Sequence, residues 1–273
     1  MKMSVFFDHI LQAQEQTGKA LEELLKGVRT SGVEAVEIRL EYMQNNKDIV
    51  YKLKQADLAV SCIYEFYDMG CHDERKKAQM HIAAAVQVGA KRVLVVPGFL
   101  HGFESKQMQY KMRNPRAIEA FLQGNKKIRC MVEGLSYIAK LGAKEGVVVT
   151  VEDFDDPNSP LSGMYGIRWF LEQIPELQYT LDTGNYLFYE EKVLEAWELL
   201  KDRVVHVHCK DRLESDNAST TVGTGYIPFE EIWKRLKAQE YEGYLAIEHF
   251  DVADQEECMR HSAENLLKIS RNF

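Results

Sequence analysis

Short apolar runs of the kind that form buried strands alternate with helical patterns eight times along this chain of 273 residues. The expected strands are 3–7, 33–39, 57–64, 91–97, 146–152, 177–182, 203–208 and 244–248. The expected helices lie near 17–31, 47–55, 73–89, 115–144, 162–174, 188–201, 228–239 and 254–271. Eight such alternations predict an α/β fold of the (β/α)8 barrel type, and a doubly wound open sheet is the main alternative because it uses the same units.

The chain shows no linker and no low-complexity stretch, so we expect a single barrel domain over residues 1–273. Apolar residues at helical spacing, such as Leu21, Leu24, Leu25 and Val28, support several of the helices. No Gly-x-Gly-x-x-Gly segment follows the first strand, and a dinucleotide site is therefore not indicated.

A polar side chain ends each of the last four expected strands. These side chains are Glu152, Asp182, His208 and Glu248. Because side chains alternate between the two faces of a strand, Glu152 shares a face with Thr150 and His208 with His206, while valines occupy the opposite faces. In a barrel these four strand ends surround one mouth, whereas an open sheet spreads them along an edge. The pattern therefore favours the barrel.

Three carboxylates and one imidazole form a mixed oxygen and nitrogen set that suits a divalent metal. For any single carboxylate, pairing with Arg or Lys or capping a helix is an equal alternative. The repetition at four corresponding positions favours the metal site. We expect His206 to be a supporting or core residue, Cys209 to be a packed thiol on the opposite face, and His249 to face outward in a structural role.

Three residues that follow these strands are candidate substrate contacts. Asn185 either orients a substrate hydroxyl or only occupies the turn after Asp182. Lys210 is placed to neutralise an enolate or bind a hydroxyl. Arg212 either contacts the substrate or forms a solvated ion pair with Asp211 in the loop.

Glu37 and Arg39 share one face at the end of the second expected strand, opposite apolar neighbours. A charged pair on the barrel side is costly unless it is paired or functional. Either the two form a salt bridge that lines the pocket, or Glu37 contacts substrate. His9, His72 and His101 are expected in early loops.

The composition is that of an ordinary globular protein, with 45% hydrophobic and 28% charged residues. A formal net charge of −8 disfavours nucleic acid as a partner, because phosphate binding depends on Lys and Arg. The five cysteines include no Cys-x-x-Cys pair and predict reduced thiols, so we expect a cytoplasmic protein. No apolar run is long enough to cross a bilayer, and the amino-terminal run is expected to be a strand rather than a signal peptide.

Several segments are similar to motifs of one superfamily. They are Ala83–Val93 with Val96-Pro97-Gly98, Val149–Glu152, Leu181–Gly184, His206–Asp211, Val222–Phe229 and Tyr241–Glu248. In this order and over nearly the whole chain, they resemble the xylose isomerase-like TIM barrel superfamily. That group holds sugar and sugar-phosphate isomerases and epimerases, inosose dehydratases and apurinic endonucleases.

The resemblance implies a metal-dependent sugar or sugar-phosphate isomerase or epimerase that acts on a ketose or related polyol through an enediolate formed by proton abstraction. Glu152, Asp182, His208 and Glu248 would hold one ion, with Mn²⁺ expected first and Mg²⁺, Co²⁺ or Zn²⁺ as alternatives. Glu152 and Glu248 would also serve as acid and base. Loss of hydroxide from the same intermediate would instead give an inosose-type dehydratase. The resemblance also implies a small sugar or polyol as partner and a homo-oligomer.

One departure from the superfamily pattern concerns Asn185, where many members carry histidine. In the apurinic endonucleases that histidine binds zinc in a site of three metals, so Asn185 disfavours this activity. In the epimerases the same histidine touches substrate, and its absence leaves the identity of the substrate open. A noncatalytic sugar-binding barrel is the remaining alternative.

Overall fold

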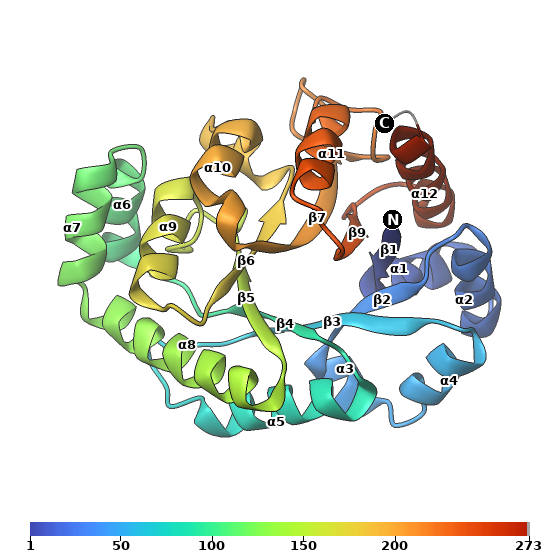
Figure 1. The fold of residues 1–273 in the computed structure, drawn as a ribbon, viewed down its shortest axis with the longest axis horizontal. Helices are drawn as coiled ribbons and strands as arrows, with labels where there is room; N and C mark the ends of the chain where they lie inside the picture. Colours follow the sequence, from blue (N-terminus) through green and yellow to red (C-terminus); the bar gives the residue numbers. More distant parts are fainter. Residues whose placement is uncertain (272–273) are drawn as a thin grey trace. The chain divides into compact units, whose positions relative to one another are not determined.

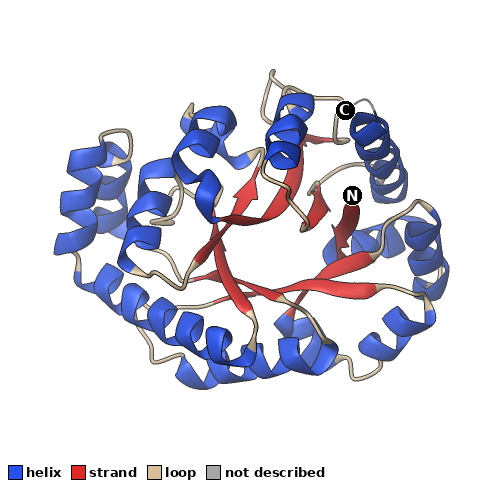
Figure 2. Cartoon of the chain, viewed as in Figure 1, coloured by secondary structure: helices blue, strands red, loops and turns tan. Residues whose placement is uncertain are grey.

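The computed structural model describes residues 1–271, and all eight apolar runs predicted as strands form strands there. Helices separate the strands along the chain (Figure 2). The chain forms two compact units. The terminal unit consists of Met1–Ser61 and of the chain from His206 onward, and the central unit consists of Cys62–Val205. Strand β3 (Ala59–Phe66) passes from the terminal to the central unit, and β7 (Val204–Arg212) passes back.

Four parallel strands and one short antiparallel strand form the sheet of the terminal unit. In spatial order they are β2 (Ala35–Arg39), β1 (Lys2–Phe6), β9 (Tyr244–Glu248), β7 and β8 (Ser219–Thr220). In the parallel register, Ser4 is opposite both Ala35 and Ala246, and His208 is opposite Ala246. Strands covered on both faces are apolar almost throughout, as the buried residues of β1 and β9 show.

The helices of the terminal unit belong to the start and the end of the chain. They are α1 (Phe7–Thr17), α2 (Leu21–Thr30), α3 (Leu40–Asn45), α4 (Ile49–Gln55), α11 (Phe229–Ala238) and α12 (Gln255–Arg271). Helix α1 packs against α2 and against α12, so the first and last long helices are neighbours. Their apolar faces cover the outside of β1 and β9.

The central unit contains four parallel strands in the order β3, β4 (Arg92–Val96), β5 (Val148–Glu152) and β6 (Gln178–Asp182). Its helices are α5 (Arg75–Val88), α6 (Gly102–Lys111), α7 (Pro115–Gly124), α8 (Lys126–Glu145), α9 (Met164–Gln173) and α10 (Val193–Leu200), with short 3₁₀ turns at Asn185–Tyr189 and Lys201–Arg203. The long helices α5 and α8 pack against each other (Figure 1).

Two predicted helices are wrong in extent. The expected helix 17–31 begins only at Leu21. Helix α1 ends at Thr17, and its C-cap Gly18 has a φ of +69°, a left-handed conformation that glycine adopts at low cost. The expected helix 115–144 is two helices. Asn125 is extended between them, and its side chain accepts hydrogen bonds from the backbone N–H groups of Lys127 and Ile128 as an N-cap.

Helices α1, α3 and α6 and strand β8 were not predicted. The buried face of α1 consists of Phe7, His9, Ile10 and Ala13, and this stripe is too mixed to give a clear helical period. His9 therefore lies in a helix, and its expected loop position is wrong. Strand β7 continues to Arg212 because β8 pairs with it. None of the helices in residues 1–271 is long and apolar enough to span a bilayer.

Candidate metal and substrate site

Glu152 and Asp182 end the neighbouring strands β5 and β6 of the central unit, as predicted. Both side chains are buried. Oδ1 of Asp182 accepts hydrogen bonds from the backbone N–H groups of Gly184, at 2.8 Å, and Asn185, at 2.9 Å. These two bonds close a tight turn after β6 and fix the orientation of the carboxylate.

A third carboxyl group, that of Asp153, contacts the backbone of Asp182. Its Oδ1 accepts hydrogen bonds from the Tyr179 hydroxyl and from the backbone N–H of Asp182, and the hydroxyls of Tyr179 and Tyr186 are 2.6 Å apart. Burial, followed by the charge of Asp182, raises the pKa of Asp153 well above its usual value. This network was not predicted from the sequence, because alternation along the strand pointed only to Glu152 at the end of β5.

His208 and Glu248 form the second half of the predicted ligand set and belong to the terminal unit. The parallel register of β7 and β9 places Lys210 opposite Glu248. Oε1 of Glu248 lies 2.6 Å from Nζ of Lys210, and Oε2 lies 3.1 Å from Nδ1 of His208. Burial acts to raise the pKa of Glu248, but opposing interactions, of which the charge of Lys210 comes first, hold this pKa well below the usual range.

Glu37 is fully buried on β2 and faces two histidines of β7. Its Oε2 lies 2.9 Å from Nε2 of His206, and its Oε1 lies 3.2 Å from Nε2 of His208. The predicted salt bridge between Glu37 and Arg39 is therefore wrong, and Arg39 instead pairs with Glu41 at 3.2 Å. The expected supporting position of His206 agrees with this contact. Contact of Glu37 with substrate stays a prediction.

The structure also shows contacts of the other candidate substrate residues. Nδ2 of Asn185 donates to the backbone oxygen of Asp153 at 2.8 Å, and a guanidinium nitrogen of Arg212 donates to the backbone oxygen of Asn217 at 2.8 Å. Asn185, Lys210 and Arg212 are all buried. Contact of these three residues with substrate stays a prediction.

Asp211 and Arg212 do not form a solvated pair in a loop, because both are buried residues of β7. Oδ2 of Asp211 accepts hydrogen bonds from the backbone N–H groups of Gly223, at 2.9 Å, and Gly225, at 2.8 Å. Oδ1 accepts another from Ile227 at 3.1 Å. A side chain on Gly225 would place its Cβ 2.4 Å from Asp211, so this approach requires glycine. The Asp211 carboxylate thus binds the backbone of Gly223-Thr224-Gly225, which we call the Gly-x-Gly loop.

His249 is buried, and its ring stacks on that of His9 in helix α1, with ring centroids 4.7 Å apart. This contact is consistent with the structural role expected for His249. Burial lowers the pKa of His249 to about 4. Cys209 is a buried thiol, as predicted, and all five cysteines are free.

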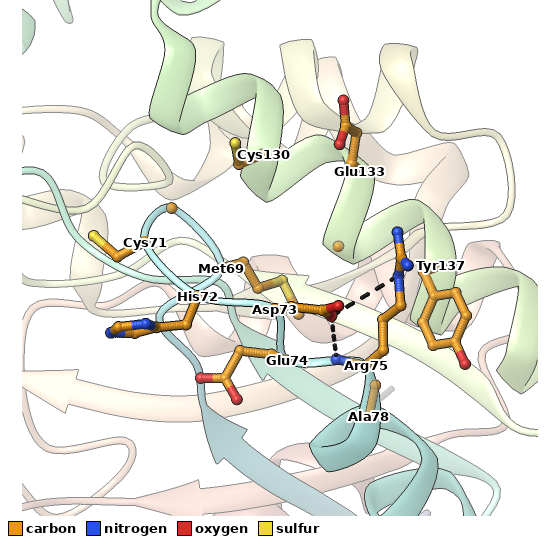
Figure 3. A pocket seen from close by; sticks show the side chains of 12 residues that line it. Met69, Cys71, His72, Asp73, Glu74, Arg75, Ala78, Cys130, Glu133 and Tyr137 are labelled. Atoms are coloured by element: carbon orange, nitrogen blue, oxygen red, sulfur yellow. Dashed lines mark hydrogen bonds and ion pairs between the residues drawn. The ribbon is translucent and has the colours of Figure 1, made fainter.

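A separate pocket of about 270 Å³ lies in the central unit between the loop after β3 and helix α8 (Figure 3). Asp73 of this loop pairs with Arg75, and the Arg75 guanidinium lies 5.6 Å from the centre of the Tyr137 ring. None of the predicted site residues lines this pocket.

The chain is similar to several known sugar-converting proteins. It is 23% identical to an inosose dehydratase of Clostridium perfringens, over 92% of this chain and 88% of that protein. It is also 23% identical to 3-dehydro-D-guloside 4-epimerase of Escherichia coli, over 83% and 86% of the two chains.

Solved structures share the fold at low identity. A probable 3-DHS dehydratase, AsbF of Bacillus anthracis, superposes with a TM-score of 0.74 at 13% identity, covering 98% of this chain and 99% of that one. The IolI protein, solved with a zinc atom, superposes with a TM-score of 0.71 at 14% identity, covering 100% and 99%. These likenesses confirm the predicted (β/α)8 barrel as the fold class.

The family model described as xylose isomerase-like TIM barrel matches residues 25–269. This range contains all four predicted metal ligands and every candidate substrate residue. The chain therefore belongs to the xylose isomerase-like TIM barrel family.

Proposed function

We propose that this protein is a divalent-metal-dependent isomerase or epimerase of a sugar or related polyol. Glu152, Asp182, His208 and Glu248 would hold the ion, and all four are buried side chains of types that bind metals. Members of the family to which the chain is similar act on sugars, as the epimerase of Escherichia coli does by name. The proposal extends that chemistry to this chain.

The observation that carries the proposal is the contact between Glu248 and His208. Oε2 of Glu248 is buried and accepts no hydrogen bond from any residue in 1–271, although Nδ1 of His208 is 3.1 Å away. If Nε2 of His208 donates its proton to Glu37, Nδ1 of the neutral ring carries a lone pair. Two acceptor atoms then face each other away from water, and a cation bound to both satisfies them. The residues present therefore fit a divalent metal.

Three carboxylates and one imidazole suit Mn²⁺, which we propose first, with Mg²⁺, Co²⁺ or Zn²⁺ as alternatives. The zinc atom in the IolI structure supports a divalent ion without selecting among these four. A bound ion would polarise the substrate carbonyl and stabilise the negative charge that develops when the neighbouring proton leaves.

The protein side chains supply the proton transfers. Glu248 is a buried carboxylate paired with Lys210 at 2.6 Å, and we assign to it the removal of the proton from the carbon beside the carbonyl. Glu152 in its protonated form would donate a proton of its own to the intermediate, and exchange with solvent would restore both carboxyl groups. Donation to the opposite face of the same carbon inverts it, and donation to the neighbouring carbon isomerises the sugar. Lys210, Asn185, Arg212 and Glu37 are the proposed substrate contacts.

We propose that the substrate carries no phosphate at the Gly-x-Gly loop. The backbone N–H groups of Gly223 and Gly225 would be the natural phosphate donors, but both already donate to the Asp211 carboxylate. Adding phosphate would place a second anion against a buried one. A neutral ketose or cyclic polyol ketone avoids this repulsion.

Dehydration of an inosose is the second candidate function. It is favoured by the match to an inosose dehydratase over 92% of the chain. The reaction begins with the same proton removal, and a hydroxide leaves in place of proton return.

The single domain over residues 1–273, the cytoplasmic location and the homo-oligomer also stay predictions.

The proposal is tested by measuring bound metal and Mn²⁺ affinity in the wild type, Glu152→Gln and Glu248→Gln. The same samples are incubated in deuterated water with ketoses and inososes, both free and phosphorylated. We expect Mn²⁺ binding and solvent deuterium uptake into one unphosphorylated substrate. We expect uptake to fall by roughly 10²- to 10⁴-fold in both variants, the range that positioned acid and base groups contribute.

A matched control is Glu191→Gln, which changes a partly buried carboxylate whose Oε2 accepts from the backbone of Met164. This variant should keep wild-type metal binding and exchange. NMR of the products distinguishes an epimer or isomer from a dehydrated ketone. Wild-type protein that binds no divalent metal under any of these conditions would refute the proposed function and support the noncatalytic barrel.

A further inference from the structure

The two oxygens of the Glu37 carboxylate are each used by a different histidine of β7. Nε2 of His206 lies 2.9 Å from Oε2, and Nε2 of His208 lies 3.2 Å from Oε1. All three side chains are fully buried. Each carboxyl oxygen thus has its own imidazole nitrogen within hydrogen-bond distance, which is the arrangement of a carboxylate that accepts from both rings.

This arrangement fixes which nitrogen of each ring carries the proton. An ionised carboxylate only accepts hydrogen bonds, so Nε2 must be the donor in both histidines. In a neutral imidazole the other nitrogen, Nδ1, is then unprotonated. For His208 this is the atom that lies 3.1 Å from Oε2 of Glu248.

The surroundings also fix the orientation of the His208 ring. The ring of Phe6 meets it edge-on at a centroid distance of 4.9 Å, and the ring of His206 meets it edge-on at 5.4 Å. His206 holds the second oxygen of Glu37, so the carboxylate is unable to rotate away from His208. Ring rotation and proton position are thus both determined by neighbours within the terminal unit.

We propose that Glu37 is a positioning residue that holds His208 in the tautomer whose Nδ1 binds the metal, with His206 as the residue that anchors Glu37. This inference rests on the proposed function, and it replaces contact with substrate as the main role of Glu37. Carboxylates that accept from the second nitrogen of a ligand histidine orient the ring and increase its basicity. A buried carboxylate adds little to folding stability by itself, because well-packed apolar residues at the same position commonly give equal stability.

The test uses the full-length protein with two readouts. The first is the tautomer of each histidine in metal-free protein, read from ¹⁵N NMR of the imidazole nitrogens. The second is Mn²⁺ affinity, read from the electron paramagnetic resonance signal of the free ion. In the wild type we expect His206 and His208 to be protonated at Nε2 only.

Glu37→Leu removes both acceptors, so the His208 proton is no longer confined to Nε2. We expect a mixed tautomer of His208 and a Mn²⁺ affinity that is lower by roughly 10- to 100-fold. Glu37→Asp keeps two acceptor oxygens and should restore most of both properties. Thr150→Val is the control for disturbing a buried polar group, because it removes the hydroxyl that donates to the backbone of Val93, and it should change neither readout.

The outcomes separate this inference from the proposed function. A folded Glu37→Leu variant with wild-type Mn²⁺ affinity would overturn the positioning role and leave the metal site intact. Protonation of His208 at Nδ1 in the wild type would overturn it as well. If the wild type binds no Mn²⁺, the proposed function fails, whereas the tautomers measured without metal still report whether Glu37 sets the proton position.

Discussion

Asp153 of the central unit and Glu248 of the terminal unit are buried acidic groups that are stabilised in different ways. In the central unit, Asp153 accepts from the Tyr179 hydroxyl and from a backbone N–H, no cation within residues 1–271 pairs with it, and burial and the charge of Asp182 raise its pKa. In the terminal unit, Glu248 lies between Lys210 and His208, and its pKa is lowered. Both groups are buried, so the nature of the neighbours, rather than burial, decides which carboxyl stays ionised.

This difference implies that neutralising Glu248 and neutralising Asp153 change the stability of the protein by different amounts. A carboxylate held by cations leaves a buried positive charge behind when it is neutralised, and that is costly. An acid held by neutral donors leaves only a weakened hydrogen bond. Three predictions test this contrast in metal-free protein.

Glu248→Gln is expected to have the largest effect on stability. Lys210 would lose the carboxylate that lies 2.6 Å from its Nζ, at a buried position. Breaking a buried pair from one side costs about 3–5 kcal/mol. Asp182→Asn should cost much less, because the amide keeps the oxygen that accepts from Gly184 and Asn185 and removes the repulsion of Asp153. Urea unfolding of the metal-free variants measures both.

Glu65→Gln is the matched control for this prediction. Glu65 is also a buried strand carboxylate with a lysine partner, but Lys77 lies 3.6 Å away and its side chain is 30% exposed. Solvent reaches that lysine, so the free energy of unfolding should fall by less than about 1 kcal/mol. Equal losses for Glu248→Gln and Glu65→Gln would show that burial of the lysine partner does not set the cost of removing the carboxylate.

Much of the fold follows from the sequence because its signals are local. Buried parallel strands are short apolar runs, and each of the eight runs is a strand in the structure. The errors lie where a single residue changes the backbone. Asn125 divides one long apolar period into α7 and α8, and an N-cap of this kind is visible in sequence only when the helix start is already known.

The positions of Glu152, Asp182, His208 and Glu248 at strand ends also follow from the sequence, since parity along a strand is local. The partners of these residues do not. Glu37 precedes His206 and His208 by about 170 residues, and sequence reasoning paired it with Arg39, which is two residues away. The Asp153 network was missed for the same reason, because Tyr179 and Tyr186 are partners only once β5 and β6 pair.

The central unit also contains a buried neutral histidine, His81, whose contribution to folding stability depends on pH. Burial lowers the pKa of His81 to about 4. Its Nδ1 lies 3.0 Å from the Tyr67 hydroxyl and its Nε2 lies 3.1 Å from the backbone oxygen of Ile63, which fits a neutral ring between a donor and an acceptor. A pKa lowered on folding gives stability that is present above the unfolded value of 6.5 and is lost as pH falls toward 4.

We therefore expect His81→Gln to remove part of the acid sensitivity. Between pH 7 and pH 4 the wild type should lose about 3 kcal/mol of unfolding free energy through His81, and the variant should lack this contribution. Urea unfolding at several pH values, compared between the two proteins, isolates it from other titrating groups. Parallel curves for wild type and variant would show that His81 does not titrate in this window.

Tyr186→Phe is expected to have the smallest effect, and it tests the neutral side of the comparison. The variant removes one hydroxyl that lies 2.6 Å from the hydroxyl of Tyr179, while Tyr179 still donates to Asp153. A single neutral hydrogen bond contributes about 1 kcal/mol to stability. Tyr189→Phe, which removes a hydroxyl that donates to the backbone of Phe154 at 3.0 Å, is the control outside the network and should lose a similar amount. If Tyr186→Phe instead lost as much stability as Glu248→Gln, the Asp153 network would carry an ionic charge, and the two units would hold their carboxyl groups by the same means.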